Sequence, residues 1–386
     1  MIFFHLLDIV RHKFLIFPEG VSMNSRGTIG VLPMFSIMIL AVGLMNHVIV
    51  IPPLIQDAKR DAWVSVLIIL VPYMLWTSLL YYIMKKTNQE LFLSWIKLNF
   101  GKLIYRIISG VFVIYLLFIS SLTLKETVMW THISYLPRTP VLMLAISMII
   151  LCSLAVHLGL EAIAITAGVL LPLIIVLGHF VMTTNLKHKN YHLLTPILEN
   201  GWSTVLEGCI YVGGGSVEII TFLLIQHELK KKIRLRFLIA VSLFLILLVF
   251  GPVTGAIAEF GPFEAAELRF PAFEEWRLVE IGKYIRHVDF LSIYQWISGA
   301  FIRISFSMYL VVEILTAYNK QTKSKYVWLA LLGIGLICIT AGIPIKDTDY
   351  LAFLKTVYLP TSLYVITGLL IMFFIMVTIS NMKRKE

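Results

Sequence analysis

The stretch CIYVGGGSVEII, residues 209–220, places three consecutive glycines and then Ser216 and Glu218 inside a long apolar run. Glycine costs about 1 kcal/mol in a helix interior relative to alanine. Within lipid, a backbone group freed from its helix must also find a protein or water partner. We therefore expect the chain to unwind at Gly213–Gly215 and to start a second half-helix, with Ser216 and Glu218 in its first turn. The alternative is close helix packing, for which small residues are common in membranes.

Composition places this run in an all-α polytopic membrane protein. Of the 386 residues, 59% are hydrophobic and 14% are charged, and the mean hydropathy is +0.89, which is outside the usual range of soluble domains. We expect residues 1–27 to form a cytoplasmic segment, 28–380 a single membrane domain and 381–386 a cytoplasmic tail, although Met23 is a second candidate start. Ten apolar stretches are long enough to be transmembrane helices: 28–54, 62–84, 103–124, 140–158, 161–184, 203–228, 235–258, 289–318, 326–345 and 358–380.

The basic residues favour an orientation with both termini in the cytoplasm. The chain has 32 Lys and Arg against 22 Asp and Glu, and most of these cations fall in the loops that share a side with the N-terminus. This distribution accounts for the net charge of +10 without a nucleic-acid partner. Cys152, Cys209 and Cys338 lie in apolar runs without metal-ligand spacing, so we expect no metal, no cofactor and no disulfide framework.

The first apolar stretch contains a counterpart of the glycine run. In AVGLMNHVIVIPPLI, residues 41–55, Gly43 precedes Asn46 and His47, and two prolines follow. Interrupted helices at corresponding positions of two five-helix halves indicate inverted repeats with a ligand site between them. Exposed N–H groups at half-helix starts attract a carboxylate, and exposed carbonyls attract an ammonium group. A zwitterionic amino acid matches both. A packing role is the alternative for His47.

Arg303, in WISGAFIRISFSMY, lies within the eighth apolar stretch. A cation at that depth needs an acid, carbonyls or a water-filled cavity. Glu161, Glu218 and Glu313 are candidate partners. One hypothesis is that Arg303 faces the bundle interior as a surrogate for a coupling cation and so removes a sodium requirement. The other is that it snorkels to the cytoplasmic surface.

The longest outer segment, 259–288, mixes acids with Phe and Trp. It is consistent with a short amphipathic helix over the outer mouth, and equally with a solvated loop.

A family resemblance rests on ordered motifs in this region and in the first stretch. The segment 270–309 resembles the signature region of the endospore germination permeases, the B subunits of GerA-type germinant receptors. The stretch ending in IPPLIQDAKRDAWVSVL resembles the same family, and the likeness extends over nearly the whole chain from about residue 25. The N-terminal extension and the triple glycine depart from the family pattern. The matching residues are Pro271, Arg277, Arg286, Asp289, Trp296, Arg303 and Ser305, together with Gly43, Pro52, Asp61, Ala62 and Trp63.

The resemblance implies a member of the amino acid, polyamine and organocation transporter superfamily, with ten helices in LeuT-like inverted repeats and broken first and sixth helices. It implies an integral protein of the inner membrane of the bacterial endospore, surrounded by membrane lipid. The function it implies is nutrient sensing: a small-molecule germinant, such as an amino acid, binds in a mid-membrane pocket and triggers germination. The implied protein partners are an A-type membrane subunit and a C-type lipoprotein.

The expected ligand contacts combine the two interrupted stretches with side walls from the third and eighth. Aromatic and small residues at such positions are also common in lipid contact and packing. The predicted ligand-binding residues are Gly43, Leu44, Met45, Asn46, His47, Tyr115, Ser120, Gly213, Gly214, Gly215, Ser216, Glu218, Trp296, Ser298 and Gly299, with Arg303 as the cation surrogate.

Two other functions compete with sensing. The first is a proton-coupled amino-acid transporter in which His47 or Glu218 carries the proton. The second is a membrane-embedded enzyme, since the chain has His132, His157, His179, His188 and His192. These histidines form no HExxH pair, and neither GxSxG nor a phosphate-binding loop occurs, so we expect no enzyme.

Overall fold

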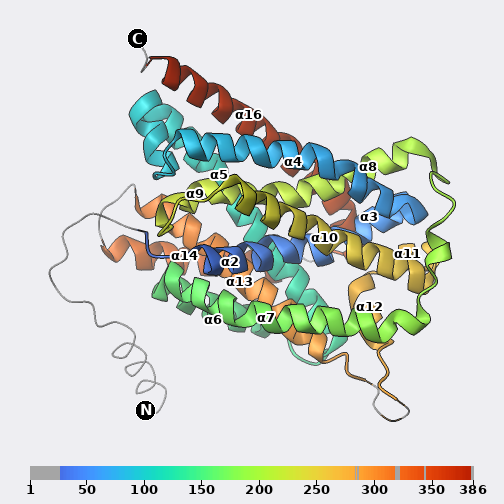
Figure 1. Cartoon of the computed structure of the whole chain (residues 1–386). Helices are drawn as coiled ribbons and strands as arrows, with labels where there is room; N and C mark the ends of the chain where they lie inside the picture. The colour runs from blue at the N-terminus through green and yellow to red at the C-terminus, as the bar shows by residue number, and fades with distance from the viewer. Residues whose placement is uncertain (1–26, 283, 285–286, 318–321, 343–344, 384–386) are drawn as a thin grey trace.

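Helices form nearly all of the regular structure, as the apolar stretches predict. The computed structural model describes residues 27–282, 284, 287–317, 322–342 and 345–383 (Figure 1). The extended pairing that joins two described residues is a bridge between Ile29 and Leu229. The α-helices are α2 Val31–Leu44, α3 Ile51–Ala58, α4 Ala62–Lys86, α5 Phe92–Ser134, α6 Val141–Leu158, α7 Leu160–Thr184, α8 Gly201–Ser216, α9 Phe222–Ile225, α10 Leu235–Phe260, α11 Pro262–Glu267, α12 Pro271–Arg277, α13 Leu291–Thr316, α14 Thr322–Gly342, α15 Asp347–Phe353 and α16 Leu359–Lys383.

Eight continuous helical runs among the described residues are long and apolar enough to cross a membrane. The first run, Val31–Lys86, has 56 residues and contains a 3₁₀ turn at Lys59–Asp61, where Lys59 has a φ of 46°. The chain reverses there, and α4 returns to the end of the bundle at which α2 begins (Figure 1). A shorter apolar helix spans Lys325–Thr340. Helix therefore occupies each of the ten predicted stretches as far as they are described.

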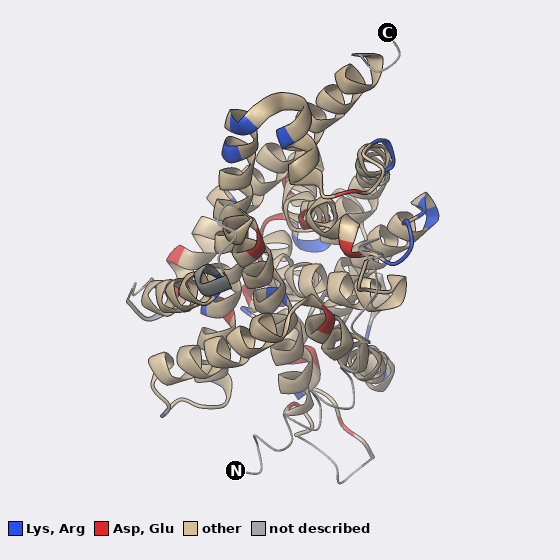
Figure 2. Cartoon of the chain, turned by 90° about the vertical axis from the view of Figure 1, so that its left-hand side faces the viewer, with Lys and Arg blue, Asp and Glu red and all other residues tan. Residues whose placement is uncertain are grey.

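Both ends of the described chain lie on the same side of the bundle. Helix α2 begins and α16 ends at the left of Figure 1. Figure 2 looks toward this side and shows Lys and Arg mainly on helix ends and connecting turns. One of these turns is the bend within α5 at Gly101. The φ of Gly101 is 86°, a backbone conformation that residues with a Cβ rarely adopt.

The prediction that the chain unwinds at Gly213–Gly215 is wrong. All three glycines lie inside α8, and the chain remains helical beyond them as a 3₁₀ segment at Val217–Thr221. Their role is close approach, because a Cβ on Gly214 would lie 2.2 Å from the carbonyl oxygen of Leu359 in α16. A Cβ on Gly215 would lie 2.6 Å from Val50. The packing alternative therefore explains the glycine run.

The first apolar stretch also stays helical. The prediction that it unwinds is therefore wrong. A π-helical segment, Met45–Ile49, joins α2 to α3, and the N–H of Val50 bonds the carbonyl of Met45 at 2.9 Å. Pro52 and Pro53 lie at the start of α3, where a missing N–H breaks few helical bonds. Polar residues here accompany a change of helix type, a feature often found at functional positions.

The segment 259–288, which was predicted to lie on the outer side, forms two short helices, α11 and α12, rather than a loop alone. In α12, Phe273, Glu275 and Trp276 are buried, whereas Arg277 is exposed. This is the amphipathic pattern of the first alternative. Helix α12 packs against α10, so it covers the interior at this end of the bundle.

Candidate functional site

A buried ion pair joins α13 to the 3₁₀ segment that follows α8. Arg303 is 1% exposed and Glu218 is 2% exposed. One terminal guanidinium nitrogen of Arg303 donates to Glu218 Oε1 at 2.6 Å, and the other donates to Glu218 Oε2. Tyr358 also donates to Glu218 Oε1, at 3.1 Å. Of the three predicted acid partners, Glu218 is therefore the one that Arg303 binds, in the two-pronged geometry that suits a carboxylate.

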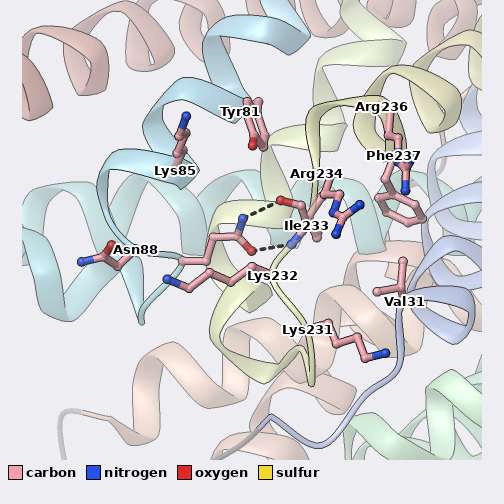
Figure 3. A pocket seen from close by; sticks show the side chains of 11 residues that line it. Val31, Tyr81, Lys85, Asn88, Lys231, Lys232, Ile233, Arg234, Arg236 and Phe237 are labelled. Atoms are coloured by element: carbon pink, nitrogen blue, oxygen red, sulfur yellow. Dashed lines mark hydrogen bonds between the residues drawn. The ribbon is translucent and has the colours of Figure 1, made fainter.

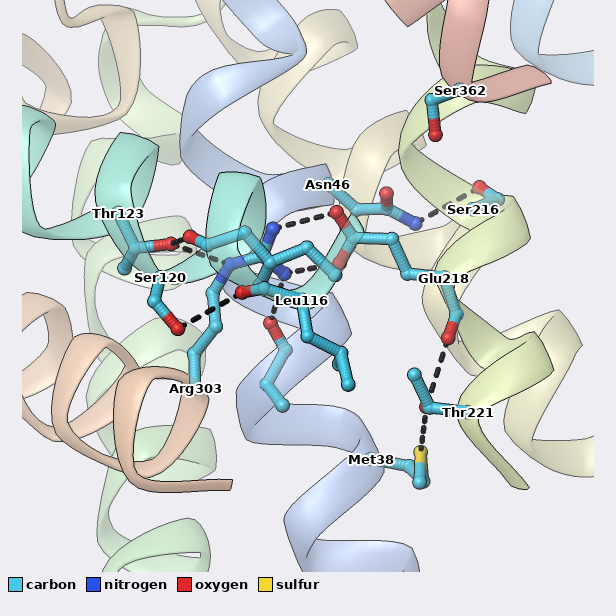
Figure 4. A network of polar contacts seen from close by, with 12 residues as sticks. Met38, Asn46, Leu116, Ser120, Thr123, Ser216, Glu218, Thr221, Arg303 and Ser362 are labelled. Carbon is cyan, nitrogen blue, oxygen red and sulfur yellow. Dashed lines mark hydrogen bonds and ion pairs between the residues drawn. The ribbon is translucent and has the colours of Figure 1, made fainter. Parts of the chain in front are cut away.

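The remaining donors of Arg303 also find acceptors inside the bundle. Its Nε donates to Thr123 Oγ1 of α5 at 2.7 Å, and a terminal nitrogen donates to the carbonyl of Ala41 in α2 at 2.7 Å (Figure 4). Arg303 thus faces the interior and does not snorkel to the surface. A buried charge pair is tolerated when further hydrogen bonds satisfy its atoms, as they do here.

Asn46 connects the two stretches that the sequence singled out. Its Nδ2 donates to Ser216 Oγ at 3.1 Å and to the carbonyl of Leu245 at 3.2 Å (Figure 4). Tyr73 of α4 donates to the carbonyl of Ser216 at 3.0 Å. We call the group Arg303, Glu218, Thr123, Tyr358, Asn46 and Ser216 the central network.

A cavity of about 270 Å³ lies beside this network and is bounded by α2, α7, α10, α12 and α13. We call it the α12 cavity. Its walls are mostly aliphatic and aromatic, and Trp296 belongs to them. Trp296 stacks on Trp130 with ring centroids 4.3 Å apart, and its Nε1 donates to Thr127 at 3.3 Å. A concave, largely apolar space with few polar groups is the usual form of a small-molecule site.

His47 brings a polar nitrogen to the cavity wall. Its Nδ1 lies 3.1 Å from the carbonyl oxygen of Leu248 in α10. Within that helix, the bond to Leu248 would come from residue 252, which is proline and has no N–H. The histidine ring therefore satisfies a carbonyl that α10 leaves open. Because a carbonyl only accepts, Nδ1 carries the proton, and a neutral ring keeps Nε2 as an acceptor.

A second pair of charges lies at the α12 end of the cavity. Lys189 Nζ lies 3.1 Å from Glu275 Oε2 and 3.7 Å from Glu259 Oε2. Burial raises the pKa of Glu275, although Lys189 opposes that shift. Burial disfavours the charged form of Lys189, but the attraction of Glu275 and Glu259 outweighs it and raises the pKa of Lys189. A Cβ on Gly255 would lie 2.8 Å from Glu275 Oε1, so glycine makes room for this pair.

The structure divides the predicted ligand-binding residues between two places. Gly43, Leu44, His47, Trp296 and Gly299 line the α12 cavity. Asn46, Ser216 and Glu218 belong to the central network, while the other residues pack within or between helices. Ser120 bonds its own helix at Leu116, and Tyr115 bonds Ser362, which donates to the carbonyl of Gly214. The residues packed away from the cavity are Met45, Tyr115, Ser120, Gly213, Gly214, Gly215 and Ser298.

Sequence reasoning missed the polar groups at the α12 end, namely Lys189, Glu275 and Gln295. Gln295 accepts from Trp276 Nε1 at 2.8 Å and donates to the carbonyl of Ile174 at 3.0 Å. The amphipathic pattern around Trp276 was the available signal, because it indicated which residues of the outer segment face inward.

Two of the signature residues differ in their contacts: Asp289 is held by Tyr135 at the end of α5, whereas Arg277 is exposed. Tyr135 donates to the backbone carbonyl of Asp289 at 2.8 Å, and burial raises the pKa of Tyr135 to about 12. Arg277 pairs with Glu274 at 2.9 Å on the surface. Arg286 lies outside the described residues. Among the described residues, no three His, Cys, Asp or Glu side chains gather as a metal site.

Fold and site together define an integral helical membrane protein with a ligand-sized cavity next to a buried ion pair. A family profile described as "Spore germination protein" matches residues 28–349. The chain belongs to this spore germination permease family. It is 41% identical over 340 residues to Spore germination protein XB of Bacillus anthracis, covering 87% of this chain and 95% of that protein. It is 25% identical over 304 residues to the Putative spore germination protein YfkT of Bacillus subtilis (strain 168), covering 78% of this chain and 82% of that protein.

Proposed function

We propose that this germination-related membrane protein is the nutrient-sensing subunit of a germinant receptor and that it binds an amino acid or similar small molecule in the α12 cavity. The observation that carries the proposal is the cavity itself, which is lined by five helices and has a volume of about 270 Å³. That volume lies just below the range of about 300–1,000 Å³ typical of drug-sized ligands. It therefore suits one small nutrient molecule.

The polar groups of the cavity match a zwitterion with an apolar side chain. Nε2 of His47 is an acceptor for an ammonium group, and Glu275 and Lys189 place a carboxyl group and an amino group at the α12 end of the cavity. The aliphatic and aromatic walls accommodate the side chain. This assignment replaces the free helix ends expected from the sequence, since the helices at 45–49 and 217–221 remain hydrogen-bonded.

The proposed topology has ten membrane crossings in two inverted repeats of five, with both termini in the cytoplasm. The reversal at Lys59–Asp61 supports two crossings within the run Val31–Lys86, and Lys325–Thr340 supplies another. The changes of helix type at Met45–Ile49 and Val217–Thr221 occupy the first and sixth crossings. Their link through Asn46 and Ser216 supports a pseudo-symmetric centre.

Arg303 is proposed to replace a coupling cation. Its guanidinium sits among a backbone carbonyl, a hydroxyl and a carboxylate, from Ala41, Thr123 and Glu218. Backbone carbonyls coordinate sodium in transporters with interrupted helices. Ligand binding should therefore be the same in sodium and in choline buffers. A strong requirement for sodium would contradict this role of Arg303.

A cavity-filling substitution tests the binding site. Gly178 lines the cavity, and a Cβ there would meet only Gln295 at an ordinary 3.6 Å. Gly178→Leu should therefore fold but occupy the ligand space. Gly368→Leu is the matched control, because Gly368 is exposed on α16 and a Cβ there would meet no atom within 4 Å.

Purified protein in lipid nanodiscs is to be titrated with a panel of amino acids by calorimetry, and spores carrying each variant are to be tested for germination. We expect Gly178→Leu to abolish binding and the germination response at normal protein abundance, and Gly368→Leu to preserve both. Unchanged binding by Gly178→Leu would remove the ligand from this cavity.

The second candidate function is proton-coupled amino-acid transport, which the position of His47 favours. His47 lines the cavity while its Nδ1 lies 3.1 Å from the carbonyl oxygen of Leu248, so the other ring nitrogen is a candidate proton acceptor. Accumulation of labelled amino acid by vesicles that contain this chain alone would favour transport. Dependence of the response on an A-type subunit and a C-type lipoprotein would favour sensing, in which the ligand shifts a conformational equilibrium that partners read.

A further inference from the structure

A second hollow lies at the end of the bundle where α2 begins, away from the α12 cavity. Its volume is about 930 Å³. One wall comes from the end of α4 and the turn after it, and the other comes from the segment that leads into α10 (Figure 3). Val31, at the start of α2, completes the lining. The hollow thus lies between the ends of three apolar helices.

Hydrogen bonds fix these walls to one another. The side chain of Gln89 is 7% exposed; its Nε2 donates to the carbonyl of Ile233 at 2.9 Å, and its Oε1 accepts from the N–H of Ile233 at 2.8 Å (Figure 3). The start of α2, which carries Val31, is held by the bridge between Ile29 and Leu229. Within it, Lys230 N donates to the carbonyl of Ile29 at 2.9 Å. The hollow is therefore a built feature and not a chance gap between mobile loops.

The hollow gathers positive charge. Five of its lining residues are cations, and all five are exposed: Lys85, Lys231, Lys232, Arg234 and Arg236. Within the part of the chain that the structure describes, no acid pairs with any of them. Like charges around one space repel each other, and an anion placed among them relieves that repulsion. The orientation rule requires cations in the loops on one side but not their convergence on a hollow.

Apolar groups adjoin the charges. Val31, Ile233 and Phe237 line the same hollow. Next to them in sequence, Leu32 is 74% exposed and Leu235 is 38% exposed. A free inorganic anion gains nothing from such neighbours, whereas an amphiphile with a charged head and apolar chains uses both. We infer that this hollow binds the phosphate headgroup of an anionic phospholipid, with the acyl chains along α2 and α10.

A paired substitution tests the inference. Arg234→Gln/Arg236→Gln removes two charges from the hollow. Lys97→Gln/Lys102→Gln removes the same charge from the exposed bend of α5, at the same end of the bundle but outside the hollow. Near an anionic membrane surface, each basic side chain contributes about fivefold in affinity. We therefore expect the first pair to weaken binding of phosphatidylglycerol about 25-fold and the second to leave it within about twofold.

The measurement is native mass spectrometry of detergent-purified full-length protein titrated with phosphatidylglycerol, phosphatidylcholine or inorganic phosphate. Selective retention of phosphatidylglycerol, lost only in Arg234→Gln/Arg236→Gln, would support the site. Equal retention of both lipids, or equal losses in the two double variants, would overturn it. Displacement of phosphatidylglycerol by millimolar inorganic phosphate would overturn the lipid assignment, because the headgroup alone would then account for binding.

Discussion

The central network and the α12 cavity share two elements, the π-helical segment Met45–Ile49 and α13, yet one is filled and the other is hollow. Asn46 belongs to the network and its neighbour His47 lines the cavity, while Gly299 and Arg303, one turn apart on α13, divide in the same way. In the network, side chains satisfy the charge of Arg303, and none of its residues lines the α12 cavity. In the cavity, apolar walls surround a few polar atoms. The difference teaches that polar residues in a membrane helix indicate burial, whereas a binding site also needs unfilled volume.

The largest expected effect is the loss of stability on removing one charge of the ion pair in the central network. Glu218→Gln leaves the guanidinium of Arg303 buried without an anion, so we expect a loss of about 3–5 kcal/mol in unfolding free energy. Thermal or denaturant unfolding in detergent measures it. The double variant Glu218→Gln/Arg303→Met, which removes both charges, should recover a large part of the loss. If Glu218→Gln alone were as stable as wild type, the network would not be a structural centre.

A smaller loss of stability is expected from substituting a glycine that packs against another helix. This loss distinguishes such glycines from those that line the cavity. A Cβ on Gly214 would lie 2.2 Å from the Leu359 oxygen, which is backbone and cannot easily move. We expect Gly214→Ala to cost about 1–3 kcal/mol of stability through overpacking between α8 and α16. Gly368→Ala serves as the control, since that position has open space. A neutral Gly214→Ala would mean that the two helices are not in close contact.

The charges at the α12 end of the cavity give a pH prediction. Burial raises the pKa of Glu275 above its usual value of 4.5. Its contribution to stability is then fully present below pH 4.5 and is lost as the pH rises through the raised value. Relative to Glu275→Gln, the wild type should lose stability as the pH rises from about 4, with a slope of at most about 1.4 kcal/mol per pH unit. Parallel unfolding curves across pH 4–8 would contradict this.

The smallest expected effect has the opposite sign. Gly178 faces the cavity, and the nearest atom to an added Cβ would be 3.6 Å away. Gly178→Ala should therefore stabilise α7 by about 0.5–1 kcal/mol, because alanine loses less backbone entropy in a helix. Unfolding measurements beside Gly214→Ala would sharpen the contrast between the two regions. A destabilised Gly178→Ala would indicate that the wall is already tightly packed.

Sequence patterns predicted the helices better than the contacts between them. Apolar stretches required helix, because unpaired backbone groups are too costly in lipid. The run Gly213–Gly215, however, is compatible with two opposite predictions, unwinding and close helix packing. Only the position of Leu359 decides between them. Glu218 was one of three candidate partners of Arg303 for the same reason: sequence carries no distance.

At the α12 end of the site, local patterns could indicate which residues face inward but not which residues they meet. Lys189 and Glu275 are 86 positions apart and meet only because α12 folds back over α10. His47 was predicted as a contact, but its neighbour Asn46 looked equally suitable. They separate because adjacent residues of a helix point in different directions, so Asn46 reaches Ser216 and His47 reaches Leu248.

Pro252 and His47 work as a matched set. Pro252 has no N–H, so it leaves one carbonyl of α10 without its helical hydrogen bond. The imidazole of His47, from another helix, supplies the missing donor. The missing N–H of Pro252, which itself lines the α12 cavity, thereby fixes the tautomer of the ring. If alanine replaced Pro252, its N–H would bond the Leu248 carbonyl within α10, and the ring of His47 would be free to rotate. A backbone change on one helix would then weaken ligand binding by a residue on another.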